Sequence, residues 1–294
     1  MRHFLLIPHL KIHNANAMSS PYTIGFPAMT AWLGAVHALQ RKLKQQGCDL
    51  NLNKVAVSCH DFNLQTYKGR GDFVHSIVGT ANPLDKDGNR PAFIEEARCH
   101  LEVSLLIEIE SSSKRQRDQL LELVNGIVAS MKFTSGDVLS AKSCTILNFD
   151  DDEDQSQQLR PILNKLMLGH VLIERRDLVI QSMQDGKDAL DSVLDYLKVT
   201  HSSIQDEDGK VTWTSKRKAQ GWLVPIAVGF QGISELGHAK NQRDVNTLHR
   251  FAESVLTLGE FVMPYRIESI DQLLWQYHVD LENNLYLCQN QNTH

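Results

Sequence analysis

Apolar residues recur at every second position in several short stretches of the chain, which is the spacing of a half-buried β-strand. The clearest stretch is residues 100–110, where Leu101, Val103 and Leu105 alternate with polar residues and Leu106 is the exception. That alternation predicts an antiparallel strand with one face in the core and one face open. Weaker patterns predict further strands at residues 3–7, 54–60, 142–149 and 221–230.

Apolar residues three and four positions apart predict helices in other stretches. The first helix follows Pro27, a residue suited to the first turn of a helix, and Gly47 marks its end. Its core-facing stripe consists of Trp32, Val36, Leu39 and Leu43. The same spacing predicts a second helix after residues 111–113, mostly helical structure over residues 155–200, and a helix over residues 243–258 that ends at Gly259.

The predicted elements of residues 1–150 follow the order strand, helix, strand, strand, helix, strand. This order is the ferredoxin-like pattern of RNA-recognition domains, so we predict an α+β fold. The run of acids at residues 150–154 is typical of a solvated connector and marks the end of this core. We therefore expect a core over residues 1–150, a mostly helical insertion over residues 151–205, and a C-terminal segment over residues 206–294 that packs back on the core.

Three segments allow more than one interpretation. Residues 61–97 are rich in turn residues, which predicts an extended hairpin or a flexible loop. Residues 210–218 are the most basic stretch and contain Trp213, a composition that suits single-stranded RNA but equally suits a solvated strand edge protected by lysines. Residues 273–287 form either a tail that docks on the core or a surface for a partner.

Composition narrows the class of protein. The chain has 294 residues, of which 42% are hydrophobic and 22% charged, as in globular proteins. Its net charge of −5 argues against a free-standing, nonspecific nucleic-acid binder, although a local basic patch is compatible with it. The scattered cysteines lack a C-x-x-C pair, which predicts reduced thiols in a cytoplasmic protein. No stretch approaches the ~20 apolar residues of a membrane span, so no membrane partner is expected.

The polar residues between the first predicted strand and the first predicted helix are the best candidates for ligand binding. They are expected in a loop, and their short side chains bond backbone groups or the polar edges of a ligand: Asn14, Asn16, Ser19 and Ser20. The helix that follows has a cationic face made of His37, Gln40, Arg41 and Lys44. Such a loop and helix suit phosphates, but a capped core helix with a solvated side would show the same residues.

The usual signatures of an active site are missing. No phosphate-binding loop, dinucleotide fingerprint, zinc-protease motif or nucleophile elbow occurs in the chain. General bases for RNA cleavage, in which a 2′-hydroxyl attacks the adjacent phosphate, are available in principle at His9, His13, His37 and His100. No pair of histidines has the spacing of metal ligands. We therefore expect no catalytic site, cofactor or metal, with a ribonuclease as the alternative.

Several blocks of the sequence, spread over nearly the whole chain, together resemble one family. They are IHNANAMSSP at residues 12–21, GFP at residues 25–27, VHALQR at residues 36–41, EEARCHLEVSLL at residues 95–106, GWLVPI at residues 221–226 and, more weakly, LGEF at residues 258–261. These blocks are similar to those of the second subunit of the type I-F (Csy) RNA-guided surveillance complex of CRISPR systems. That subunit is a Cas-five-like member of the RAMP superfamily.

The resemblance implies a ferredoxin-like RAMP core with a helical, thumb-like insertion. It implies that the chain holds the 5′ handle of the guide crRNA, pairs with the large subunit, abuts a Cas-seven-like backbone subunit, and reaches target DNA through the assembled complex. It also implies a non-catalytic role, since a separate endonuclease subunit cleaves precursor RNA in this family. The alternatives are a RAMP-type endoribonuclease that processes precursor crRNA and a protein-binding scaffold without RNA.

The candidate RNA contacts follow from both lines of argument. We expect RNA on loops and on the first helix, because the open face of the strand at residues 100–110 offers His100 and carboxylates instead of a row of stacking aromatics. The candidates for polar contacts are Asn14, Asn16, Ser19 and Ser20. The candidates for phosphate contacts are His37, Arg41, Arg98 and Arg250, of which the last is placed by helix geometry alone.

Overall fold

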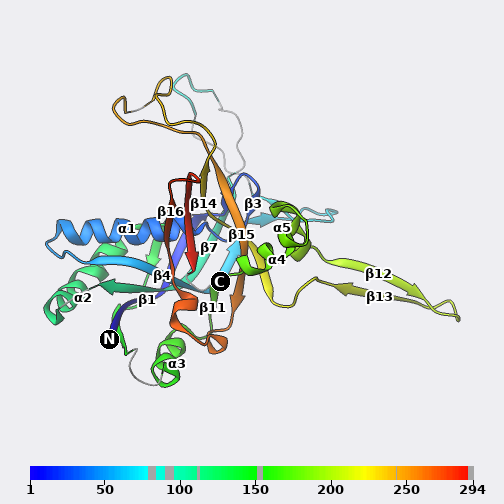
Figure 1. The fold of residues 1–294 in the computed structure, drawn as a ribbon, viewed down its shortest axis with the longest axis horizontal. Coiled ribbons are helices and arrows are strands. Elements are labelled where there is room, and N and C mark those ends of the chain that lie inside the picture. The colour runs from blue at the N-terminus through cyan, green and yellow to red at the C-terminus, as the bar shows by residue number, and fades with distance from the viewer. Residues whose placement is uncertain (79–83, 90–95, 111–112, 151–154, 243, 291–294) are drawn as a thin grey trace.

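The computed structural model describes residues 1–78, 84–89, 96–110, 113–150, 155–242 and 244–290. One large antiparallel sheet runs through the molecule and helices lie against it, which confirms the α+β class (Figure 1). Residues 151–154 of the expected acidic connector, Arg243 at the start of the last predicted helix and parts of the 61–97 segment lie outside the described residues.

The large sheet contains β1 (Arg2–Asn16), β4 (Asn51–Leu64), β7 (Arg98–Glu110), β8 (Lys132–Phe133), β9 (Gly136–Ser140), β10 (Thr145–Phe149), β11 (His170–Glu174), β14 (Trp222–Gly232), β15 (Ala252–Val262), β16 (Trp275–Asp280) and β17 (Leu285–Asn290). Three small sheets pair β2 (Met18–Ser20) with β3 (Thr23–Ile24), β5 (Thr66–Tyr67) with β6 (Ser76–Ile77), and β12 (Thr200–Gln205) with β13 (Val211–Lys216). The helices are α1 (Met29–Gln45), α2 (Lys114–Ala129), α3 (Gln155–Leu166), α4 (Arg176–Gln184) and α5 (Ala189–Leu197), with 3-10 turns at Pro264–Arg266 and Ile270–Leu273.

The first half of the sheet has the strand order β4-β7-β1-β9, and all neighbours in it are antiparallel. Helix α1 connects β1 to β4 through the small β2–β3 hairpin, and α2 connects β7 to the strands that end this layer. Both helices bury their apolar stripes in one core against β1, β4 and β7. The chain therefore follows the predicted order of strand, helix, strand, strand, helix, strand.

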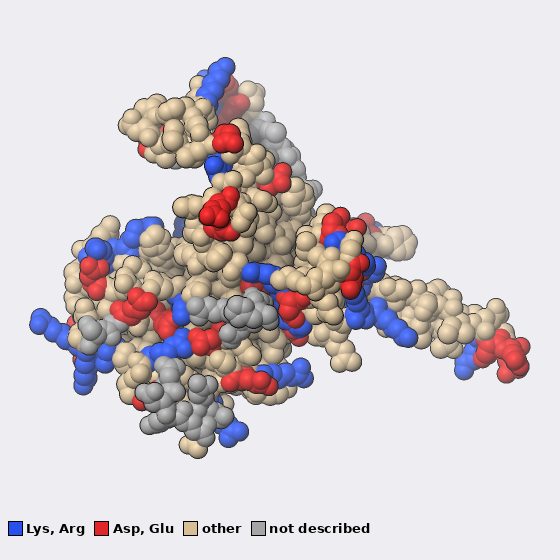
Figure 2. Space-filling view, viewed as in Figure 1, with Lys and Arg blue, Asp and Glu red and all other residues tan. Residues whose placement is uncertain are grey.

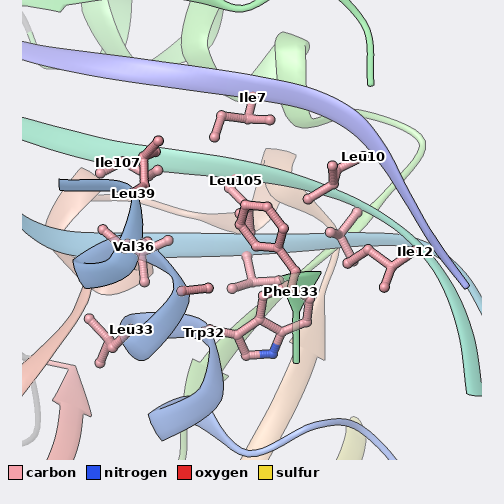
Figure 3. Packing of buried hydrophobic residues seen from close by; sticks show 14 of the residues in the cluster. Ile7, Leu10, Ile12, Trp32, Leu33, Val36, Leu39, Leu105, Ile107 and Phe133 are labelled. Atoms are coloured by element: carbon pink, nitrogen blue, oxygen red, sulfur yellow. The ribbon is translucent and has the colours of Figure 1, made fainter. Parts of the chain in front are cut away.

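Helix α1 forms one wall of the main core. Trp32 and Val36 are buried, and the stripe to which they belong faces Leu105 of β7 and its neighbours (Figure 3). The predicted stripe is therefore confirmed. Pro27 lies two residues before the helix begins at Met29, so it leads into the helix and does not occupy the first turn as predicted.

The opposite face of the same strands is divided into an apolar half and a polar half. Phe4, Leu6 and Leu106 are buried on the apolar half, in a second core that includes α3. This explains why Leu106 interrupts the alternation of β7: it is covered by a helix from the inserted segment. The polar half carries histidines and charged side chains that are partly or fully exposed, such as Lys11 and His13.

The second half of the sheet closes into a ring of six strands. Strand β4 pairs with β16 at Val55 and with β11 at Ser58 and Cys59, and the order β11-β15-β14-β17-β16 completes the circuit. Trp275 of β16 is fully buried, and its Nε1 donates a hydrogen bond of 2.9 Å to the Leu172 carbonyl. The C-terminal stretch thus packs on the core, and a role of its exposed side in partner binding stays a prediction.

The prediction of a helix over residues 243–258 is wrong. Residues 244–251 form turns and irregular structure, and residues 252–258 belong to strand β15, which pairs with β14 on one side and with β11 on the other. Gly259 lies inside this strand, where a Cβ would come within 2.9 Å of the Leu172 Cδ1, and it does not end a helix. Pairing with two distant strands outweighs the local three- and four-residue spacing, and Phe251 of the supposed apolar stripe is 72% exposed.

The predicted insertion over residues 151–205 contains α3, α4 and α5 as expected, but also strands β11 and β12, which the sequence pattern did not indicate. Strand β11 pairs with β4 and β15, and α3 packs against the core sheet. These contacts tie the segment to the rest of the molecule. The boundaries drawn at residues 150 and 205 stay a prediction.

Two segments extend away from the sheet (Figure 1). The β12–β13 hairpin is exposed along its whole length apart from the partly exposed Thr214, and Figure 2 shows acidic side chains at its tip and basic ones nearer its base. The other extension is the connection over residues 233–251 between β14 and β15. Within the 61–97 segment, β5 and β6 pair as a short hairpin, and the rest of that prediction stays untested. No helix in the described part of the chain has the length and apolar character needed to cross a membrane.

Candidate nucleic-acid interface

The polar half of the second sheet face forms one continuous surface, which we call the polar strip. Alternate residues of β7 point to this face, and the register of β1 places Lys11 opposite Glu102 and Asn16 opposite Arg98. The strip consists of Arg98, His100, Glu102 and Ser104 of β7, His9, Lys11, His13, Asn14 and Asn16 of β1, and His60 of β4. Along β7 it is roughly 20 Å long.

The first feature of the strip is a stacked pair of imidazoles, His9 and His60, with ring centroids 4.4 Å apart. His9 Nδ1 lies 2.7 Å from a Glu102 carboxylate oxygen, and His60 Nε2 lies 2.7 Å from the Ser104 hydroxyl. The backbone N–H of His9 also donates to Ser104 Oγ at 3.0 Å. Burial, helped by the nearby His9 and Lys142, lowers the pKa of His60, while Glu102 opposes that shift. His60 is therefore held mainly as a neutral ring at neutral pH.

A second stacked pair, His13 and His100, lies further along the strip with centroids 4.2 Å apart. The backbone N–H of Asn14 donates to His100 Nδ1 at 3.1 Å, and the Gln65 amide contacts His100 Nε2. Burial and then the neighbouring His13 lower the pKa of His100. The two pairs present flat aromatic rings and N–H groups side by side along one face.

Backbone irregularities bring these histidines together. The register of β1 against β7 shifts between Ile7 and Leu10 and again between Ile12 and Ala15. His9 and Asn14 adopt positive φ angles of 50° and 61° at these two points. Each shift is a local bulge that redirects side chains without ending the strand. Strand β1 therefore continues to Asn16, into the segment that we expected to be a loop. Asn14 and Asn16 accordingly lie in a strand.

The fixed charges of the strip occur as ion pairs. Lys11 Nζ lies 3.5 Å from Glu102, whose pKa is lowered chiefly by the hydrogen bond from His9. Arg98 forms an ion pair with Glu96, and its Nε is buried without a partner among the described residues. Each of the two fixed cations therefore has a carboxylate partner, Glu102 for Lys11 and Glu96 for Arg98, and four imidazoles lie on the same strip. Within the described chain, no three histidine, cysteine or acidic side chains converge as metal ligands.

The structure brings three of the candidate contacts onto the strip and leaves five away from it. Asn14, Asn16 and Arg98 lie there, although the Asn16 amide is also bonded to the Met18 backbone at 3.0 and 3.2 Å. Ser20 is 6% exposed, and its hydroxyl is 2.7 Å from Thr23 Oγ1, which fits a structural role in the β2–β3 turn. The Ser19 hydroxyl is likewise 2.9 Å from Thr23 Oγ1.

His37 and Arg41 lie on the exposed side of α1, on the other face of the sheet from the strip. Arg41 Nη1 is 3.4 Å from His37 Nδ1, and His37 borders a hollow of about 320 Å³ with Tyr277. Gln40 of the same face accepts a hydrogen bond from the Leu52 backbone. Since Leu52 pairs with the far end of β7, this pair is roughly 35 Å along the strand from Arg98.

Arg250 lies neither on the polar strip nor with His37 and Arg41. It precedes β15 instead of lying on a helix, and its guanidinium donates to Asn284 Oδ1. The helical placement that suggested Arg250 is therefore wrong. Its side chain links the β14–β15 connection to the turn after β16. Sequence reasoning missed His60 and Lys11 as members of a ligand-binding surface. The sequence feature that could have indicated His60 was its place at the end of an alternating strand, two residues beyond Ser58 on the same face.

The polar, histidine-rich sheet face is the candidate interface of this α+β protein. Comparison with known proteins identifies the family. The family described as CRISPR-associated protein (Cas_Csy2) matches residues 5–288. The chain is also 33% identical over 307 residues to the CRISPR-associated protein Csy2 of Pseudomonas aeruginosa (strain UCBPP-PA14), covering 96% of this chain and 93% of that protein.

The chain therefore belongs to the Csy2 family of the type I-F CRISPR system. This confirms the resemblance to the second subunit of the Csy complex that the sequence blocks indicated.

Proposed function

We propose that this protein is a non-catalytic subunit that holds the 5′ handle of crRNA in the type I-F complex, with the polar strip as its main RNA contact. The observation that carries the proposal is the meeting of Asn14, Asn16 and Arg98 with two stacked histidine pairs on one exposed sheet face. We also propose that the β4-β7-β1-β9 layer is a ferredoxin-like RAMP core, because its strand order and connections follow that pattern.

The chemistry of the strip suits a short single-stranded RNA. Unstacked bases are bound by flat side chains, histidine included, and by hydrogen bonds to their polar edges, while phosphates are bound by cations. His13 and His100 offer rings, Asn16 offers an amide, and Lys11 and Arg98 offer charge. A strip of roughly 20 Å has room for a few nucleotides and not for a long duplex. This modifies our expectation that RNA would avoid the sheet.

The remaining candidates and partners complete the proposal. His37 and Arg41 form a separate cationic patch that would contact another part of the crRNA. The large subunit and a Cas-seven-like backbone subunit are the expected protein partners, and target DNA is reached through the assembled complex. The exposed β12–β13 hairpin, with its basic base, fits the thumb-like element expected of the fold better than the helices do.

Four imidazoles on one face also favour a second candidate function, RNA cleavage by general acid–base catalysis. The contacts of the rings argue for the holding role. His9 is engaged by Glu102, His60 by Ser104, and His100 by the Asn14 backbone. The four histidines of the strip also stack on one another in pairs.

A binding experiment tests the proposal. We expect Arg98→Ala to weaken binding of a labelled RNA that carries the repeat-derived handle by about tenfold, because a charged hydrogen bond is lost. The slope of log affinity against log salt should fall by about 0.7, since one phosphate contact with single-stranded RNA is removed. Arg160→Ala, on the exposed side of α3, is the matched control and should bind as the wild type does.

The same experiment separates the alternatives. Arg41→Ala should lower affinity without altering the effect of Arg98→Ala, because the two residues lie far apart. If Arg98→Ala keeps the affinity and the salt slope of the wild type, the strip is not the RNA site. A denaturing gel of the recovered RNA distinguishes a holder from a nuclease, since only the nuclease shortens it. A chain that retains no RNA at any salt concentration is a protein-binding scaffold.

A further inference from the structure

A pocket opens at the end of the polar strip, beside His60. Its volume is about 410 Å³, and we call it the aromatic pocket. Four aromatic rings and two imidazoles line it: Phe26, Phe62, Trp222 and Phe261, with His60 and His170. These residues come from five places in the chain, namely the segment after β3, the end of β4, β11, β14 and β15. The fold therefore assembles a site that no local motif encodes.

The inner wall of the pocket is built by ring packing. Phe26 packs edge-on against Phe261 with centroids 5.2 Å apart, and Phe261 in turn contacts Trp222 at 5.2 Å. Phe26 and Phe261 are 7% and 9% exposed, so their positions are set by the core. Phe26 also stacks on Trp32 of α1 at 5.7 Å. The wall is thus preformed and continuous with the main core.

The mouth of the pocket leaves large aromatic surface open. Trp222 is 54% exposed and Phe62 is 37% exposed. Exposed aromatic surface around a hollow is a common mark of a binding site, because solvation of these rings is unfavourable. The rim is polar: His60 and His170 line the pocket together with Asp61, which is exposed. The site therefore combines flat apolar walls with hydrogen-bonding groups at its edge.

We propose that the aromatic pocket receives one unstacked nucleobase of the RNA that lies along the polar strip. The inference rests on the proposed function, since it needs RNA on the strip. His60 connects the two sites, because it stacks on His9 in the strip and lines the pocket. A base that leaves the strip at this point enters a space large enough for it, with rings to stack on and Asp61 and the imidazoles near its polar edge.

The rim favours a base over the apolar side chain of a protein partner. An aliphatic side chain in the pocket would bury His60, Asp61 and His170 without giving them hydrogen bonds, which is costly. A nucleobase carries hydrogen-bond donors and acceptors along its edge, and these satisfy the three side chains of the rim. It also presents a flat face to Trp222, and stacking of that kind is tolerant of base identity.

An abasic scan of the handle RNA tests this inference. We would measure the affinity of the full-length chain for the intact RNA and for RNAs in which each nucleotide in turn lacks its base. One position should cost the wild type about 5- to 100-fold in affinity, as expected for the loss of one base–aromatic stack. Trp222→Ala should lose a similar factor with the intact RNA, and it should lose nothing further at that one position.

Three further variants make the result decisive. Trp222→Phe keeps a ring and should retain most of the affinity, which separates stacking from a folding defect. Phe62→Ala should reproduce the loss seen with Trp222→Ala. Trp213→Ala is the matched control, because Trp213 is 69% exposed on the β12–β13 hairpin and lies outside the pocket. It should leave the penalty at the sensitive position unchanged.

The outcomes that overturn the inference differ from those that overturn the function. If the chain binds RNA but Trp222→Ala shows the same penalty at every abasic position as the wild type, no base enters the pocket. Loss of the co-purified large subunit in Trp222→Ala, with RNA affinity unchanged, assigns the pocket to a protein side chain and also overturns the inference. Failure of the wild type to bind RNA at all overturns both proposals.

Discussion

Trp32 and Trp275 are both fully buried, yet they differ in one hydrogen bond. Trp275 Nε1 donates to the Leu172 carbonyl, whereas Trp32 Nε1 is buried without a partner among the described residues. We expect Trp275→Phe to lower the free energy of unfolding by about 1–2 kcal/mol more than Trp32→Phe does. Both changes remove a similar volume, but only Trp275→Phe removes a bonded group. Urea titration of the two variants measures the difference.

Trp32 also provides a reference value for the cost of a cavity in the main core. Trp32→Ala should cost roughly 3–5 kcal/mol, because it leaves a large cavity in the main core. If Trp32→Phe proves as costly as Trp275→Phe, then Trp32 has a polar partner that the described residues do not include. Its role in the core was predicted from the spacing of the apolar stripe, whereas the location of Trp275 was left open by the sequence.

The histidines of the polar strip show the limit of sequence reasoning for single residues. His9, His13 and His100 were noticed individually, but their pairing was not foreseen. It depends on two register shifts in β1 and on the long-range pairing of β1, β4 and β7. A bulge moves a side chain to the other face of a strand, so alternation in the sequence alone cannot assign the face beyond it.

Strand β14 is held by two neighbours, and Gly229 sets how closely one of them approaches. A Cβ at this position would lie 2.0 Å from the Tyr286 carbonyl oxygen of β17 and 2.8 Å from the Leu287 Cα. We expect Gly229→Ala to separate β14 from β17 and to lower the free energy of unfolding by about 2 kcal/mol or more. Thermal or urea unfolding with circular dichroism detection measures this loss.

Gly126 provides the matched control at the same scale. It is an exposed residue within α2, and a Cβ there would meet nothing within 4 Å. Gly126→Ala should therefore raise the free energy of unfolding by about 0.5–1 kcal/mol, because alanine favours the helix. If Gly229→Ala is as stable as the wild type, β14 and β17 are not as closely paired as described here.

Elements with strong local patterns were predicted well, and elements that depend on distant partners were not. Helix α1 and strand β7 follow from their periodicity, and α2 begins after Ser113, as the predicted helix after residues 111–113 does. Strand β11 has only five residues and is specified by pairing with β4 and β15. The start of β15 and the residues before it were predicted as a helix because Leu248, Phe251 and Val255 have helical spacing, although two neighbouring strands decide the conformation of β15.

On the scale of the whole molecule, the β12–β13 hairpin is nearly independent of the rest. Its side chains are exposed along almost its whole length, and its described cross-strand pairs join only its own two strands. We expect replacement of residues 200–216 by a short Gly-Ser linker to leave the free energy of unfolding of the remainder within about 0.5 kcal/mol of the wild type. Urea titration followed by core tryptophan fluorescence measures this directly.

Removal of a matched length from the sheet provides the contrast. Deletion of β16 and β17 should prevent folding, because it opens the six-strand ring and removes Trp275 from its buried site. A loss of more than about 1 kcal/mol on replacing the hairpin would mean that it packs on the body of the molecule. An isolated two-stranded hairpin is marginally stable in water, so a partner surface is its natural complement.

The sequence by itself determined the α+β class, the order of elements in the first 150 residues, the buried stripe of α1 and, through its matched blocks, the Csy2 family. These features depend on local periodicity or on the residues themselves, which are readable along the chain. The tertiary structure alone decided the six-strand ring, the division of the second sheet face into apolar and polar halves, and the meeting of the strip and the aromatic pocket at His60. Those features are set by register, bulges and packing between segments far apart in the chain, and no local spacing encodes them.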